Sequence, residues 1–145
     1  SWCCCRRRWR CGARIRTALG GVLEHPAASL AWAAFGLPEP VRNGGWSRGM
    51  CGGWSCHVEQ GHYGHRARKA TWLYAFGCDL PRLAWGPSSA TARLDDGYHS
   101  AEERQAAKAR GEHGGGDIIS HRERHATPHE FRDVLLAMAR SAGSR

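Results

Sequence analysis

The polar and apolar positions change period along the chain, and these changes predict separate strands and helices. Val22–Leu23 is a short apolar run that ends at Glu24, which predicts a buried strand with a polar end. Pro26 follows, and we expect it to open a helix because the first helical turn does not need the N–H that proline lacks. Residues 27–36 then show helical spacing with a glycine stop. The apolar stripe of this helix is Leu30, Ala31, Ala34 and Phe35.

Two later segments alternate with the period of a strand. Residues 54–60 place apolar and polar side chains on opposite faces, which predicts a strand with one buried side. One face carries Trp54, Cys56, Val58 and Gln60, and the other carries Ser55, His57 and Glu59. Residues 71–77, TWLYAFG, are apolar on both faces, which predicts an interior strand.

The strongest helix signal lies in residues 127–143. Thr127 is placed to cap the helix, Pro128 takes the first helical position, and Glu130 completes a capping box with the threonine. The apolar stripe of this helix consists of Phe131, Val134, Leu135 and Met138. Gly143 is the expected stop.

Composition divides the chain into four parts. Residues 1–20 form a basic, Cys/Arg-rich leader without an apolar period, which we expect to be disordered or non-native. The leader lacks the order of a secretory signal and has no initiating Met, so the start is either processed or a piece of a longer reading frame. Residues 21–86 hold the predicted strands, residues 87–116 have the composition of a polar linker, and residues 117–145 hold the capped helix. The order strand, helix, strand, strand, helix predicts an α/β layer.

The net charge and the cysteines indicate which kind of partner the chain would bind and in which compartment it would occur. The net charge of +8 and the pI of about 9.6 favour an anionic partner, although a codon bias toward Arg, Ala and Gly explains the same composition equally well. All but two of the 21 basic residues are arginines, whose planar side chain suits phosphates and base edges. The seven cysteines show no disulfide framework, which predicts a reducing, cytoplasmic compartment. No apolar run is long enough to cross a bilayer, so we expect no membrane contact.

The segment QGHYGHRARK contains the densest positive charge of the predicted core. Arg66, Arg68 and Lys69 fall within four residues, and the glycines at positions 61 and 64 let the backbone approach a ligand closely. The segment is therefore either a phosphate-binding turn or a charged hairpin corner that faces water. Three positive charges at this density favour an anionic partner.

Cysteine and histidine side chains near the same turn raise the alternative of a zinc site. Zinc favours four nitrogen or sulfur ligands, which Cys51, Cys56, His62 and His65 would supply. The two cysteines are five residues apart, and an expected strand separates them from the histidines. We therefore predict no metal site, and keep a small zinc-stabilised nucleic-acid-binding module as the alternative.

Four stretches of the chain together resemble a known family. They are VLEHPAASLAWAAFGL, the Gly/Trp-rich strand that follows it, QGHYGHRARKATWLYAFGCDLPRL and RERHATPHEFRDVLLAMAR. In this order they resemble the C-terminal part of phage-type DNA methyltransferase-like proteins, which are similar to the cytosine-5 DNA methyltransferases. The resemblance implies an incomplete Rossmann-like α/β layer. It also implies that Glu24 is a catalytic carboxylate that contacts a flipped cytosine, that Arg66, Arg68 and Lys69 contact DNA, and that the cofactor is S-adenosylmethionine.

Two motifs that this chemistry requires are missing from the sequence. The chain has no Pro-Cys pair to deliver the nucleophilic thiolate, and it has no Gly-rich cofactor loop after a first strand. We therefore expect a fragment that is inactive alone, retains salt-sensitive DNA binding and lacks an N-terminal half. A non-functional gene remnant is a further alternative. The central structural expectation is that Val22–Leu23 lies beside residues 72–76, which would bring Glu24 and the basic turn to one rim.

Overall fold

The structure is a computed structural model that describes residues 20–42, 44–50, 52–94, 101–111 and 117–142. Most of the predicted leader, Cys51 and Gly143 lie outside these ranges. The described strands are β1 (Gly21–Pro26), β2 (Ser47–Arg48), β3 (Trp54–Glu59) and β4 (Ala70–Phe76). The described helices are α2 (Leu30–Phe35), the 3-10 helix η1 (Gln60–Tyr63), α3 (Ala101–Ala109), α4 (His121–His125) and α5 (His129–Ala142).

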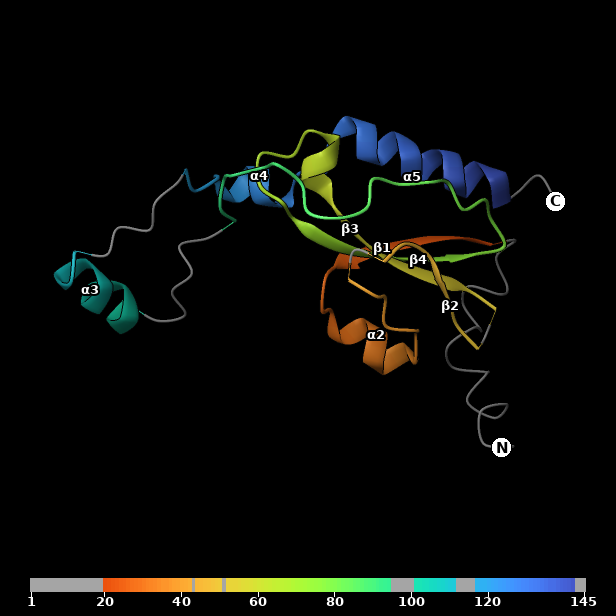
Figure 1. Ribbon diagram of the computed structural model, residues 1–145, viewed down its shortest axis with the longest axis horizontal. Coiled ribbons are helices and arrows are strands. Elements are labelled where there is room, and N and C mark those ends of the chain that lie inside the picture. The colour runs from red at the N-terminus through yellow and green to blue at the C-terminus, as the bar shows by residue number, and fades with distance from the viewer. Residues whose placement is uncertain (1–19, 43, 51, 95–100, 112–116, 143–145) are drawn as a thin grey trace.

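Within the described residues, the four strands form one antiparallel sheet with helices on both faces. The strand order is β1-β4-β3-β2. Helix α5 covers one face and α2 the other, while α3 lies apart from the sheet (Figure 1). A mixed α and β class is therefore confirmed. None of the described helices combines the length and the apolar character that crossing a bilayer requires.

The pairing of β1 with β4 confirms one part of the central structural expectation, that Val22–Leu23 lies beside residues 72–76. Val22 lies opposite Ala75 and Leu23 lies opposite Tyr74, so the first strand borders the aromatic strand along its whole length. Strand β4 has β3 on its other side, as its apolar faces predicted. The prediction of one buried face for β3 is wrong: from Ser55 to Glu59 both faces are buried, because helices cover both sides of the sheet.

Helix α5 follows the predicted apolar stripe. Phe131 is fully buried in a cluster, and Met138 is buried in a second one. The first cluster contains Cys56, Val58, Leu73 and Leu83, and the second contains Ala75, Cys78 and Ala142. The helix begins at His129, one residue later than expected, and the carbonyl of Pro128 accepts from the backbone N–H of Arg132. The capping box that the structure records belongs to α4, between Ser120 and Glu123.

Helix α2 corrects two expectations. Pro26 belongs to β1, and the helix begins only at Leu30, after Ser29 caps it by accepting from the N–H of Ala31. The predicted apolar stripe faces solvent, since Leu30 is 86% and Phe35 is 52% exposed. The buried residue is Trp32, whose indole N–H lies within hydrogen-bond distance of the Pro38 carbonyl and the Ser55 hydroxyl. Gly36 stops the helix with a positive φ, as predicted.

Candidate functional site

Glu24 lies near the end of the edge strand β1, on the face that α5 covers. It is half-buried and pairs in register with Leu73 of β4. Successive strand residues point to opposite faces, so His25 lies on the α2 side, where its Nδ1 is 3.0 Å from the Ser29 hydroxyl. The side-chain amide of Gln60 approaches the Glu24 carboxylate, with 3.4 Å between Nε2 and Oε1. The side chains of Glu24 and His25 therefore lie on opposite faces of the sheet.

Lys69 lies at the same end of the sheet as Glu24, just before β4 begins. It is a non-glycine residue at φ 40°, and its ammonium group donates to the carbonyl of Ala126 at 2.7 Å. Burial lowers the pKa of Lys69, and the negative charge of Glu24 opposes this shift. The β1–β4 register therefore places the predicted acid and one of the three predicted cations at the same end of the sheet.

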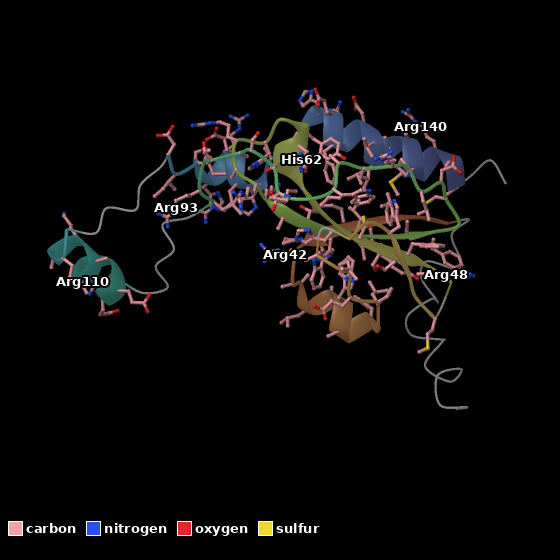
Figure 2. The ribbon with its side chains drawn as sticks, in the orientation of Figure 1. Arg42, Arg48, His62, Arg93, Arg110 and Arg140 are labelled. Carbon is pink, nitrogen blue, oxygen red and sulfur yellow. The ribbon has the colours of Figure 1, made fainter. Side chains whose placement is uncertain are left out.

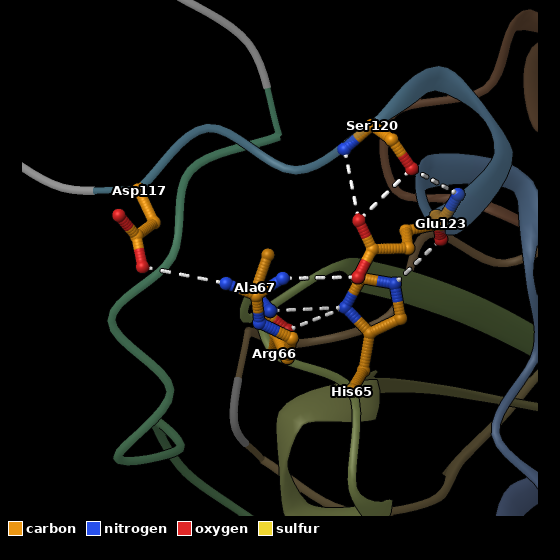
Figure 3. A network of polar contacts seen from close by, with 6 residues as sticks. All are labelled: His65, Arg66, Ala67, Asp117, Ser120 and Glu123. Atoms are coloured by element: carbon orange, nitrogen blue, oxygen red, sulfur yellow. Dashed lines mark hydrogen bonds and ion pairs between the residues drawn. The ribbon is translucent and has the colours of Figure 1, made fainter.

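Arg66 points instead toward the segment that contains α4. Its guanidinium forms ion pairs with Glu123 at 3.0 Å and with Asp117 at 3.4 Å (Figure 3). The backbone N–H and the hydroxyl of Ser120, together with Arg66, lower the pKa of Glu123 to about 2. Arg66 is exposed, so a phosphate can reach it. A phosphate that binds there competes with the carboxylates of Asp117 and Glu123.

The neighbouring His65 fixes the basic turn to the same segment. Its Nδ1 lies 3.1 Å from the backbone nitrogen of Ala67 and 2.9 Å from the carbonyl oxygen of the same residue. Its Nε2 lies 3.2 Å from the carbonyl oxygen of Glu123 (Figure 3). A buried imidazole between two backbone segments indicates a structural role for His65.

The charge of Arg68 helps to lower the pKa of Glu59, the last residue of β3. Burial raises the pKa of Glu59, but hydrogen bonds from the backbone N–H and the hydroxyl of Ser88, together with the charge of Arg68, outweigh burial and lower it. The two bonds measure 2.7 and 3.0 Å, and both end on Oε2. The three predicted cations are therefore directed at different groups: Arg66 at Asp117 and Glu123, Arg68 at Glu59, and Lys69 at the carbonyl of Ala126.

Two further buried polar groups, to which the sequence assigned no role in DNA binding, lie near these residues. His57 is buried on the α2 face, and its Nδ1 has no hydrogen-bond partner among the described residues. Burial lowers the pKa of His57, Glu59 opposes the shift, and Arg42 adds to it. Gln60 is fully buried beside Glu24. The only sequence signal for either residue is a polar side chain in a strand whose neighbours are buried.

The residues of the zinc alternative do not form a cluster in the described part of the chain. No three His, Cys, Asp or Glu side chains of that part are grouped to hold a metal ion, and Cys51 lies outside it. His62 Nε2 lies 2.9 Å from the Gly86 carbonyl, and His65 bonds to backbone as described. Cys56 is buried under α5, and burial raises the pKa of its thiol.

Basic side chains are spread over the molecule. Figure 2 shows Arg140 on α5, Arg48 on β2, and Arg93 and Arg110 toward the opposite end of the view. These arginines therefore lie at both ends of the described part of the molecule.

Comparison of the chain with known protein families, with curated proteins and with solved structures finds no match.

Proposed function

We propose that this chain is a DNA-binding domain related to the cytosine-5 methyltransferases. In this proposal Glu24 contacts an unpaired base, and Arg66, Arg68 and Lys69 contact phosphates. The observation that supports it most is the antiparallel pairing of β1 with β4, because this pairing puts Glu24 and Lys69 at one end of the sheet. An acceptor for a base edge and a donor for a phosphate then lie at the same end of the sheet.

The chemistry of Glu24 defines which bases would bind. A carboxylate accepts hydrogen bonds, so it favours bases with an exocyclic amine, such as cytosine, over thymine. Such a base must leave the duplex stack to reach a half-buried side chain, and single-stranded DNA avoids that cost. Lys69 beside it would hold the adjoining phosphate as a point charge.

We further propose that the chain binds DNA without transferring a methyl group by itself. The nucleophile in this chemistry is a thiolate, and burial raises the pKa of the Cys56 thiol, which lies under α5. In this proposal an N-terminal half would supply the Pro-Cys loop and the site that binds S-adenosylmethionine. A Rossmann-like layer has mostly parallel strands, whereas the described strands pair antiparallel. The proposal therefore depends on where the β1–β4 pairing puts Glu24 and Lys69, and not on a Rossmann-like topology.

Fluorescence anisotropy with single-stranded oligo(dC) and oligo(dT) of about 12 nucleotides tests the proposal. The logarithm of the association constant should fall with the logarithm of KCl concentration with a slope of about −2, if each of the three cations neutralises one phosphate. Arg68→Gln should make this slope shallower. Arg140→Gln, which removes the same charge at the far end of α5, should leave it close to wild type.

The base contact has its own variant. Glu24→Gln should reduce the preference for oligo(dC) over oligo(dT) by about fivefold or more, because an amide replaces one carboxylate acceptor. Glu39→Gln, an exposed position outside the site, is the matched control. Binding that does not change with salt, or a wild-type protein that does not distinguish the two oligonucleotides, would refute the proposal.

A further inference from the structure

The side-chain amide of Gln60 is fully buried, and its hydrogen bonds to described residues are made by the nitrogen. Its Nε2 donates to the Thr71 hydroxyl at 2.9 Å and approaches the Glu24 carboxylate at 3.4 Å. Both neighbours accept, since the Thr71 hydroxyl itself donates to the carbonyl of Lys69. This fixes the orientation of the amide. Its carbonyl oxygen, Oε1, has no partner among the described residues.

The side-chain carbonyl of Gln60, which has no partner in the described part of the chain, does not favour folding. A buried carbonyl without a partner is destabilising, and an apolar side chain of similar length would avoid that loss. Gln60 also follows β3 directly, as the first residue of η1, and Cys56 and Val58 of that strand belong to the apolar core beneath α5. At such a position an apolar residue is the expected choice. The amide therefore requires an explanation other than stability.

The nitrogen of the amide, Nε2, provides that explanation. Through Nε2, Gln60 connects Glu24 to Thr71, and Thr71 connects in turn to the backbone of Lys69. The acid on an edge strand is thereby tied to the central strand and to the cationic corner. Without that tie, the Glu24 side chain would be free to rotate toward solvent.

We infer that Gln60 is a positioning residue, which holds the Glu24 carboxylate in the orientation that accepts a base amine. The inference rests on the proposed function. It gives Gln60 no contact with DNA, because the side chain is fully buried. Gln60 then controls base preference through Glu24, and its effect on salt-dependent phosphate binding is small.

Gln60→Met tests the inference, because methionine keeps an unbranched side chain of similar length and removes both polar ends. The matched control is Gln105→Met on the exposed surface of α3. Two quantities are measured for each: the midpoint of urea unfolding and the ratio of oligo(dC) to oligo(dT) affinity. For Gln60→Met we expect an unfolding midpoint equal to or above that of wild type, and an affinity ratio at least about threefold lower. Gln105→Met should change neither.

The outcomes separate the inference from the proposed function. A Gln60→Met protein that fails to fold, or that keeps the wild-type ratio while Glu24→Gln loses it, overturns the inference and leaves the proposed function standing. A wild-type protein without any base preference overturns both. A purely structural glutamine would give the opposite pattern, with a lower unfolding midpoint and an unchanged ratio.

Discussion

The contact of Phe131 with the sheet provides the sharpest prediction about stability. Its side chain is fully buried against the residues that line the α5 face, and its ring centroid lies 5.1 Å from that of Tyr63. Replacing a fully buried phenylalanine by alanine costs about 3–5 kcal/mol, which combines the lost transfer free energy with the cavity that remains. Small domains unfold with only about 5–15 kcal/mol, so Phe131→Ala removes a large share of the total.

Urea unfolding followed by tryptophan fluorescence measures this loss, since the chain has seven tryptophans. For a small domain a loss of this size lowers the unfolding midpoint by about 2 M. Leu136→Ala is the control on the same helix: that leucine is 43% exposed, and its truncation should change the free energy of unfolding by less than about 0.5 kcal/mol. If Phe131→Ala does not fold, Phe131→Leu should fold with a loss below about 1.5 kcal/mol.

A loss of less than about 1 kcal/mol for Phe131→Ala would refute the reasoning. So would equal losses for the Phe131 and Leu136 variants. Either result would mean that α5 does not pack on the sheet through the face that contains Phe131.

Two further predictions concern carboxylates. Ser88→Ala should destabilise the fold by about 2 kcal/mol near neutral pH, because it removes a hydrogen bond to buried Glu59. The folded-state pKa of Glu59 is lowered, so this contribution is present above the ordinary pKa of 4.5 and is lost as pH falls; chemical unfolding at several pH values should show the two proteins converging in acid. Glu123→Gln should raise affinity for oligo(dC) about two- to fivefold by releasing Arg66, as measured by anisotropy. Asp133→Asn, which removes the same charge from α5, should raise it less.

The long elements were predictable because their patterns repeat over enough residues. Helix α5 has 14 residues with a regular stripe from Phe131 onward, and β4 is apolar on both faces. Helix α2 has only six residues, so its apolar stripe was too short to predict which face is buried. The buried face was decided by Trp32, whose partners Pro38 and Ser55 follow it in sequence and show no local signal.

The site was predictable only where strand pairing determines it. Glu24 and Lys69 lie at the same end of the sheet because β1 pairs with β4 and Lys69 directly precedes β4. The positions of Arg66 and Arg68 depend on acids elsewhere in the chain. Arg66 pairs with residues 117 and 123, more than 50 positions away, and no periodicity of the basic turn encodes that contact.

The burial of Cys56 makes it an internal reporter of helix opening. Iodoacetamide reacts with the thiolate of an accessible cysteine, and Cys56 meets neither condition while α5 covers the sheet. Alkylation at this position therefore requires the helix to detach or the domain to unfold. Mass spectrometry of the peptide that contains Cys56, sampled over time, would report how often the domain opens without any engineered label.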